Sequence, residues 1–282
     1  MPKNKNRNKL LNKHILITGG SSGIGLAIAE GAVKQGAHIT LVARCNDKLL
    51  NAKNKISLST ITPHQKINYI SIDVCNELQV SNRLTTFLQK ESVPDIVINC
   101  AGTAKPDYFE NISLDQFEQT IRLNLFGARN IIATLLPYMQ KQKENTQSHI
   151  INVSSMAGLI GVFGYTDYCA SKFALIGFSE ALRSELKPKG IKVSVLCPPD
   201  TDTPGFAIEN QTKPKETNAI SKGASLMSSA AVADYLLAQL FKKQFLLIPG
   251  LESQVSYYAK RYTPRIVELF MDRVINKVQK RP

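Results

Sequence analysis

Short apolar runs alternate with amphipathic stretches along most of the chain, and this alternation constrains the fold more than any other feature. The runs are rich in β-branched residues, as strands are, and the stretches between them have helical spacing. Because most runs are apolar throughout, we expect strands that are buried on both faces. The sequence therefore predicts one α/β domain with a doubly wound parallel sheet of about seven strands and helices on both faces. The predicted strands are residues 14–18, 38–43, 67–72, 95–99, 149–153, 192–197 and 245–248.

Two segments interrupt the alternation. Residues 198–228 are rich in Pro, Thr and Lys and are too long for a plain connection, so we expect a substrate lid. Residues 251–282 follow the last predicted strand, and we interpret them as a basic, amphipathic extension of the same domain. Within it, Thr263 and Pro264 predict the N-cap and first turn of a helix. Apolar residues then recur at helical spacing: Val267, Phe270, Met271, Val274, Ile275 and Val278.

The net charge of +13 is concentrated at the two ends of the chain. Residues 1–13 carry five basic and no acidic side chains, and residues 254–282 carry seven basic and two acidic ones. The body of the chain holds only +3, which does not indicate a nucleic-acid-binding patch. Basic ends are compatible with attraction to an anionic surface, either a membrane or a polyanion, and equally with solubilising tails.

Cysteine and histidine usage points to a reduced, metal-free protein. The five Cys show no CxxC spacing and lie mostly in apolar runs, which is typical of buried, reduced thiols in the cytosol. The four His show no metal-ligand spacing, so we expect no metal. The N-terminus has no signal-peptide pattern, and no apolar run approaches the ~18 residues that span a bilayer. We therefore expect a cytoplasmic protein, soluble or peripheral to a membrane.

The stretch TGGSSGIG, residues 18–25, follows the first predicted strand and opens the first helix. Gly19, Gly23 and Gly25 permit a tight turn, and the helix N-terminus offers free N–H groups to a pyrophosphate. Such a motif alone also fits a plain glycine turn, but its place between strand and helix favours a dinucleotide site. We accordingly divide the chain into a basic flexible tail (1–12), a dinucleotide-binding domain (13–250) and the extension (251–282).

The residue at the end of the second strand distinguishes NAD from NADP, because an acid there holds the ribose 2′-hydroxyl of NAD. This chain has LVARCNDK, without an acid at the strand end. Arg44 is suited to pair with a 2′-phosphate, assisted by Ser21 or Lys48, so we expect NADPH/NADP. Asp73, after the third strand, is a candidate partner of the adenine amino group, with a solvated loop Asp as the alternative.

The stretch YTDYCASK, residues 165–172, places Tyr168 and Lys172 four residues apart. On a helix this spacing puts both side chains on one face. A free Tyr has a pKa of roughly 10, and a neighbouring cation favours its phenolate form. The two residues therefore suit a proton-transfer pair, although one such pair by itself also occurs by chance.

Taken together, the motifs resemble the short-chain dehydrogenase/reductase family over essentially the whole domain. They are TGGSSGIG, NCAG (99–102), Asn124 in IRLNLFG, Ser155 in NVSSMAG and YCASK (168–172), in the order and at the spacings of that family. The resemblance implies a Rossmann-like fold and hydride transfer from a nicotinamide to a carbonyl carbon.

The resemblance also implies a role for each of four residues. Tyr168 donates the proton, and Lys172 lowers the Tyr pKa and holds the nicotinamide ribose. Ser155, selected over Ser154 by its spacing to the Tyr, orients the carbonyl, although a plain turn Ser is the alternative. Asn124 holds a water that relays protons to the Lys, or else satisfies a buried backbone group.

The resemblance further implies that CPPDTDT (197–203) lies against the nicotinamide. Thr203 is the expected amide partner there, and Pro199 replaces a glycine that is usual in the family. Asn99 and Gly102 are expected to shape the backbone beside the cofactor. The expected cofactor contacts are Gly19, Ser21, Ser22, Gly23, Ile24, Gly25, Arg44, Lys48, Asp73, Val74, Asn99, Ala101, Gly102, Tyr168, Lys172, Pro198, Thr201 and Thr203.

Three longer runs, 161–175, 197–217 and 257–280, resemble the branch of this family that reduces 3-ketodihydrosphingosine, a long-chain keto lipid, with NADPH. A different NADPH-dependent reductase, of 3-oxoacyl or hydroxysteroid type, and a non-catalytic NADP-binding protein are the alternatives. The basic C-terminal helix suits peripheral membrane contact, or else packs on its own domain or a partner. From the family we also expect a homo-oligomer.

Overall fold

The computed structural model describes residues 9–142, 148–222 and 225–280. At its centre lies a seven-stranded sheet in the order β3-β2-β1-β4-β5-β6-β9, and every neighbouring pair of strands is parallel. The predicted doubly wound sheet is therefore confirmed. Its strands are β1 (His14–Thr18), β2 (His38–Ala43), β3 (Ile67–Ser71), β4 (Ile96–Asn99), β5 (His149–Val153), β6 (Lys192–Leu196) and β9 (Leu246–Leu247).

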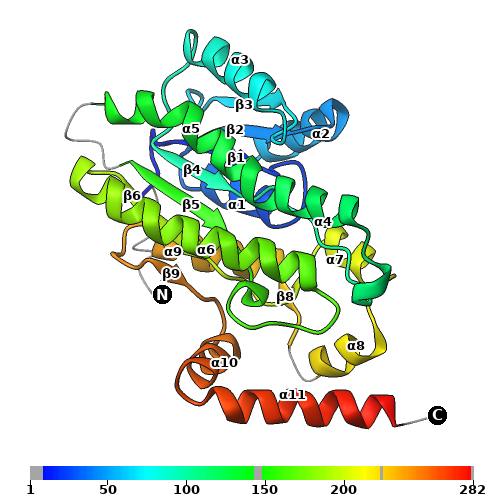
Figure 1. Ribbon diagram of the computed structural model, residues 1–282. Coiled ribbons are helices and arrows are strands. Elements are labelled where there is room, and N and C mark those ends of the chain that lie inside the picture. Colours follow the sequence, from blue (N-terminus) through cyan, green and yellow to red (C-terminus); the bar gives the residue numbers. More distant parts are fainter. Residues whose placement is uncertain (1–8, 143–147, 223–224, 281–282) are drawn as a thin grey trace.

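Helices cover both faces of the sheet, because each parallel crossover carries one. Figure 1 shows α5 and α6 in front of the sheet and α1 and α9 behind it. One face is covered by α1 (Gly23–Val33), α2 (Asn46–Ser57) and α9 (Ser229–Gln239). The other is covered by α3 (Glu77–Leu88), α5 (Gly127–Gln140) and α6 (Thr166–Leu186). Short 3₁₀ turns lie at η1 (Phe109–Asn111), η3 (Met156–Gly158) and η4 (Lys187–Lys189).

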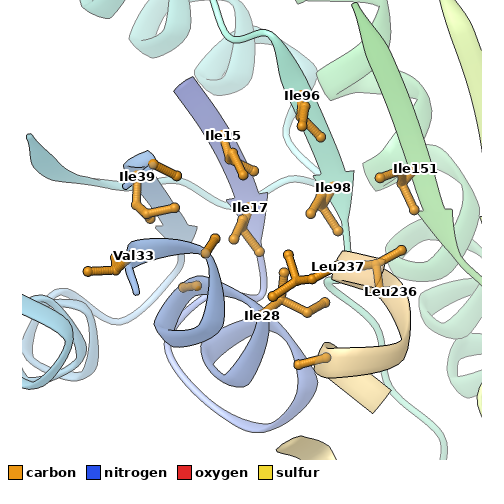
Figure 2. Close-up of a cluster of buried hydrophobic side chains, with 14 of the residues drawn as sticks. Ile15, Ile17, Ile28, Val33, Ile39, Ile96, Ile98, Ile151, Leu236 and Leu237 are labelled. Carbon is orange, nitrogen blue, oxygen red and sulfur yellow. The ribbon is translucent and has the colours of Figure 1, made fainter. Parts of the chain in front are cut away.

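The two faces hold separate hydrophobic cores, which follow from the alternation of side chains along each strand. On β1, Ile15 and Ile17 point into the core beneath α1 and α9, where they meet Ile28 and Leu236, as Figure 2 shows. Leu16, between them, points into the opposite core beneath α5. All of these side chains are fully buried. Each contributes about 1.5–3 kcal/mol to stability through burial, which explains why the strands are apolar throughout.

The N-terminal segment enters the core earlier than the sequence suggests. Residues 1–8 of the expected basic tail lie outside the described residues. Residues 9–12, however, form a turn in which Leu10 is fully buried in the core beneath α1. Leu10 therefore packs with the domain, although the division at residue 13 places it in the tail. Two adjacent leucines among polar neighbours have no periodic pattern that marks which one is buried.

The helical stretch 114–140 contains a change of helical geometry. An α-helix, α4 (Leu114–Ile121), continues into a π-helical turn, η2 (Arg122–Phe126), and then into α5. Asn124 lies in the π turn. A π turn accommodates one extra residue in a helix and is found most often at functional sites.

The segment expected to be a lid contains helices and a short strand pair. Its described residues form α7 (Pro204–Glu209), α8 (Lys215–Ser221) and a small parallel pair, β7 (Thr201–Asp202) with β8 (Met227–Ser228). Helices α10 (Leu251–Tyr262) and α11 (Pro264–Gln279) follow β9, and α11 packs on α8 along the lower edge of the molecule (Figure 1).

Thr263 is the N-cap residue of α11 and Pro264 begins the helix, as predicted, although the Thr263 hydroxyl donates to Ala259 O (2.9 Å) in the preceding helix and makes no capping bond. One smaller expectation about side chains is wrong. Cys45 is exposed, whereas Cys169 and Cys197 are buried as expected. Within the described residues, no helix is both long enough and apolar enough to cross a bilayer.

Candidate active site

A cavity of about 930 Å³ opens at the carboxyl ends of the central strands. The chain order reverses at this point, because β1 pairs with β2 on one side and with β4 on the other. In open parallel sheets, ligands bind at such switch points. The glycine-rich loop after β1 lines one end of the cavity, and the lid and α11 line the other.

Two glycines of the loop after β1, Gly19 and Gly25, are packed so tightly that a side chain at either position would clash with the backbone. Gly19 has a φ of +66°, and a Cβ on it would lie 2.9 Å from Ala101 N. A Cβ on Gly25 would lie 2.5 Å from Gly19 O. The N-cap residue of α1, Ser22, makes no side-chain capping hydrogen bond, so its hydroxyl does not occupy the helix N-terminus. A loop with these features fits a pyrophosphate, whose oxygens accept from backbone N–H groups.

Most of the expected cofactor contacts line the cavity. These are Gly19, Ser22, Gly23, Ile24, Gly25, Ala101, Gly102, Tyr168, Lys172, Pro198, Thr201 and Thr203. The others lie outside its lining: Ser21, Arg44, Lys48, Asp73, Val74 and Asn99.

Arg44 is exposed just beyond the end of β2. The glycine loop contacts this strand end, because Gly20 N donates to Val42 O at 3.3 Å. Lys48 is likewise exposed, one turn into α2. Both cations therefore project into solvent beyond the edge of the loop, where they are free to bind an anionic group at its rim.

Of the four remaining contacts, Ser21 is half-buried in the glycine loop. The other three are engaged within the protein. Asp73 Oδ1 accepts from Cys75 N at 3.0 Å, a local turn bond. Val74 is buried, and its carbonyl accepts from Asn130 Nδ2 at 3.0 Å. Asn99 donates to Asn152 Oδ1 at 2.9 Å, whereas its own Oδ1 is buried without a hydrogen-bond partner among the described residues. Asn99 thus joins β4 to β5 directly beneath the cavity.

Tyr168 and Lys172 lie on one face of α6, as their spacing predicts. The Lys172 Nζ is 5.6 Å from the centroid of the Tyr168 ring. Lys172 is only 4% exposed and donates to Val153 O at 2.9 Å, at the end of β5. This bond fixes the ammonium group between the end of β5 and the phenol.

Burial dominates the electrostatics of the pair. It lowers the pKa of Lys172 to about 8, because desolvation disfavours the ammonium form. Burial also raises the pKa of Tyr168 above its ordinary value, and the negative charge of Glu209 adds to this rise. A hydrogen bond with Ser155 opposes the rise. The expectation that the Tyr pKa is lowered is therefore wrong for the chain by itself, and Tyr168 stays protonated at neutral pH.

Ser154 and Ser155 have different environments. The Ser154 hydroxyl is buried and donates to Lys172 O at 3.0 Å, which ties β5 to α6. Ser155 is partly exposed to the cavity, and its Oγ accepts from Ala157 N at 3.1 Å while retaining its own proton for a second bond. The spacing argument thus selects the serine whose hydroxyl faces the phenol.

Asn124 is 1% exposed and bonds to the protein on all sides. Its amide donates to Thr103 O and to Ser171 Oγ, each at 2.9 Å, and its Oδ1 accepts from Thr103 N at 2.9 Å. The side chain therefore holds the loop after β4 against α6. This contact agrees with the second of the two expectations for Asn124, the satisfaction of buried backbone groups. A Cβ on Gly102 would lie 3.0 Å from Asn124 Oδ1, so glycine is needed there too.

The segment 197–203 forms the cavity wall beside the glycine loop. Thr203 has its methyl group against Gly23, and its Oγ1 accepts from Phe206 N at 3.0 Å as the N-cap of α7. Its hydroxyl proton is left for another acceptor. Thr201 donates to Pro199 O at 2.8 Å, which closes a tight turn at the unusual proline.

The far end of the cavity includes residues that the motifs did not identify. Tyr165 is buried beside Tyr168, with ring centroids 5.6 Å apart, and its hydroxyl donates to Glu209 Oε2 at 3.2 Å. Apolar side chains from the loop after β5, from α8, and from α10 and α11 complete this end: Ile160, Val162, Ile220, Val255, Ile266, Val267, Phe270 and Met271. The helical spacing of residues 267–278 was the available signal for part of this wall.

Comparisons with known proteins agree with this geometry. A family model described as short chain dehydrogenase matches residues 13–214. A 3-ketodihydrosphingosine reductase from Bos taurus is 44% identical over 237 residues, which cover 82% of this chain and 69% of that protein. A 3-dehydrosphinganine reductase from Danio rerio is 42% identical over 242 residues, covering 84% of this chain and 71% of that protein.

Among solved structures, a short chain dehydrogenase/reductase from Burkholderia phymatum in complex with NAD has a TM-score of 0.79. The match covers 92% of this chain and 96% of that chain at 20% sequence identity. At this identity the match speaks for the fold alone.

Proposed function

This chain belongs to the short chain dehydrogenase family, and on that basis we propose that it reduces the keto group of 3-ketodihydrosphingosine to dihydrosphingosine with NADPH. The relatives named for this reaction match at 40–44% identity over most of the chain. The observation that carries the proposal is the continuity of one cavity from the glycine loop, past Tyr168, to the apolar wall of α10 and α11. A long-chain ketone needs such a wall for its hydrocarbon tail.

A nicotinamide cofactor fits the glycine loop, because the loop lines the cavity and the N-terminus of α1 has no side-chain cap, which leaves its N–H groups to a pyrophosphate. When bound, the cofactor supplies the hydride. We propose NADPH rather than NADH, because Arg44 lies exposed beyond β2 and no acid stands at that strand end. Lys48, one turn into α2, adds a second exposed cation on the same side.

In the proposed mechanism the keto oxygen binds between the Ser155 and Tyr168 hydroxyls. As the carbonyl carbon gains a hydride, negative charge develops on this oxygen, and the phenol proton moves to it. The raised pKa of Tyr168 keeps the phenol protonated beforehand, as a donor must be. Lys172, with a pKa near 8, is suited to stabilise the phenolate and to return a proton to it.

We propose that Asn124 acts as a positioning residue. Its three hydrogen bonds fix the loop after β4 to Ser171 on α6, and Ser171 in turn donates to Tyr168 O at 2.7 Å. Displacement of Asn124 would therefore move the backbone that carries Tyr168.

The first experiment is NADPH oxidation by the purified protein with 3-ketodihydrosphingosine in detergent, beside Tyr168→Phe and a short 3-oxoacyl thioester. We expect turnover of the sphingoid ketone by the wild type and a loss of at least roughly 100-fold in the variant, which lacks the donated proton. Turnover of the thioester alone would support the proposed mechanism but refute 3-ketodihydrosphingosine as the substrate. Bound NADPH without turnover of either would refute both.

We further propose that α10 and α11 contact an anionic membrane, from which the lipid substrate enters. Large apolar side chains on these helices are 54–77% exposed: Leu251, Val255, Tyr258, Tyr262, Ile266, Leu269 and Phe270. Basic residues accompany them: Lys260, Arg261, Arg265, Arg273, Lys277 and Lys280. Apolar side chains flanked by cations suit the boundary of a negatively charged bilayer.

This contact is tested by co-sedimentation with vesicles of phosphatidylcholine, with and without phosphatidylserine. We expect binding to the anionic vesicles, weakened by salt and by Leu269→Asp, and unchanged by Leu58→Asp, which alters an equally large exposed side chain at the C-cap of α2. Equal effects of both substitutions, or no binding, would refute the proposal. A change of oligomeric state with Leu269→Asp would assign the surface to a second copy instead.

A further inference from the structure

The segment 198–228 carries three acidic side chains near the cavity, Asp200, Asp202 and Glu209, and their surroundings differ. Asp202 is exposed on β7 and is not part of the cavity lining. Asp200 lines the cavity but lies 3.8 Å from the Lys213 ammonium, which is itself buried. Glu209, the last residue of α7, lines the cavity and accepts a hydrogen bond from the neutral Tyr165 hydroxyl. Glu209 is thus the carboxylate that is oriented into the cavity by an uncharged donor.

Glu209 lies beside the reaction centre. The Tyr165 ring, whose hydroxyl holds the carboxylate, packs against the Tyr168 ring at 5.6 Å between centroids. The negative charge of Glu209 contributes to the raised pKa of Tyr168. Burial raises the pKa of Glu209 itself to about 7, opposed by the Tyr165 hydrogen bond and by the charge of Lys213. A half-buried carboxylate with a raised pKa gains from a cation that enters the cavity.

The proposed substrate carries such a cation in the required place. In 3-ketodihydrosphingosine the amino group is bonded to the carbon adjacent to the keto carbon. When the keto oxygen is at Tyr168 and Ser155, the ammonium therefore lies a few ångströms away. The hydrocarbon chain leaves from the other side of the ketone, toward an apolar wall that includes Val255, Val267 and Met271.

We propose that Glu209, positioned by Tyr165, binds the ammonium group of the amino ketone and so determines substrate specificity. The inference rests on the proposed function. Binding the ammonium compensates the negative charge next to Tyr168, which makes the phenol a stronger acid at the moment it must donate its proton. A ketone without an amino group would leave this carboxylate unpaired, which weakens the binding of that competing substrate.

The test compares two ketones of equal length, 3-ketodihydrosphingosine and 1-hydroxyoctadecan-3-one, which lacks only the amino group. We expect Glu209→Gln to lower kcat/KM for the amino ketone by roughly 10- to 100-fold and to change kcat/KM for the des-amino ketone by less than about threefold. Asp202→Asn, which removes a carboxylate of the same lid outside the cavity, is the matched control. It should leave the ratio of the kcat/KM values for the two ketones unchanged.

The dependence on pH gives a second measure. Because the pKa of Glu209 is about 7, its charged fraction grows as pH rises through 7. The preference of the wild type for the amino ketone should increase as pH rises through 7 while the substrate amine keeps its proton, and Glu209→Gln should abolish the increase. The ratio of the two ketones cancels titration of groups that act on both, namely Tyr168 and Lys172. Asp200, Lys213 and Tyr165 also face Glu209, and they remain in the variant.

The outcomes separate the inference from the function. If the wild type reduces the amino ketone and Glu209→Gln affects both ketones equally or neither, the inference is refuted and the function stands. If the wild type reduces the des-amino ketone but not the amino ketone, both are refuted. Folding is checked by NADPH fluorescence on binding, which the chain does not obscure because it has no Trp. Should Glu209→Gln fail this check, Tyr165→Phe releases the same carboxylate, and an unchanged ratio refutes the inference.

Discussion

Replacing Asn124 by leucine tests whether this residue acts by holding the fold or by relaying protons. The two side chains are similar in size, so the change removes the hydrogen bonds of Asn124 without opening a large cavity. Three bonds are lost, to Thr103 N, Thr103 O and Ser171 Oγ. Two of these partners are backbone groups of Thr103 in partly buried bonds, and a buried backbone group costs about 1–3 kcal/mol when left unpaired.

We therefore expect Asn124→Leu to lower the free energy of unfolding by about 3 kcal/mol, with a fall in Tm of roughly 6–12 °C for a domain of this size. Turnover should fall with it, because Ser171 connects Asn124 to the backbone of Tyr168. Urea unfolding followed by circular dichroism gives the stability, and NADPH oxidation gives the turnover.

The partner Ser171→Ala and the double variant complete a thermodynamic cycle. Because Asn124 and Ser171 share a hydrogen bond, the double variant should be less destabilised than the sum of the single ones, by roughly 0.5–1.5 kcal/mol. Asn130→Leu, which removes a buried amide of α5 with one backbone acceptor, should cost less than Asn124→Leu. A full loss of turnover with unchanged stability would contradict the positioning role and favour a proton relay through Asn124.

Three further predictions concern the cofactor loop, cofactor choice and pH. Gly25→Ala should weaken NADPH binding at least tenfold in a fluorescence titration, because the new Cβ would lie 2.5 Å from Gly19 O; unchanged affinity would contradict the close packing of the loop. Arg44→Asp should shift the kcat/KM ratio of NADPH to NADH by roughly 10- to 100-fold toward NADH, and an unshifted ratio would exclude Arg44 as the 2′-phosphate partner. Burial lowers the pKa of His149 to about 3 from an unfolded value of 6.5, so the unfolded chain binds the extra proton and stability is lost as pH falls from 6.5 toward 3. That loss should reach roughly 4 kcal/mol and be absent in the His149→Gln variant by urea unfolding, and equal slopes in the two proteins would refute the assignment.

Sequence patterns predicted those parts of the molecule that depend on local periodicity. The seven strands were found to within a residue or two, because doubly buried strands are apolar throughout. The glycine loop and the shared face of Tyr168 and Lys172 follow from spacing along one element, and the structure places both at the cavity. The amphipathic pattern of residues 264–278 likewise predicted the helix α11.

Patterns along the chain did not reveal which of several similar residues meet in space. Leu10 lies in the core and Leu11 beside it does not, and Tyr165 lies beside Tyr168 although it is outside the YCASK motif. Asn124, in a π turn, bonds to two other segments. Each of these features depends on contacts between residues that are distant in sequence.

The sequence by itself determined the order of strands and helices along the chain, the glycine loop and the presence of a Tyr–Lys pair, because each depends on residues that are close together in the chain. Only the tertiary structure decided how charges act on one another. Burial, which no local pattern records, raises the pKa of Tyr168 and lowers that of Lys172. The packing of the lid also gives its three acidic residues different neighbours. Glu209 accepts a hydrogen bond from Tyr165, Asp200 lies near Lys213, and Asp202 is exposed to solvent.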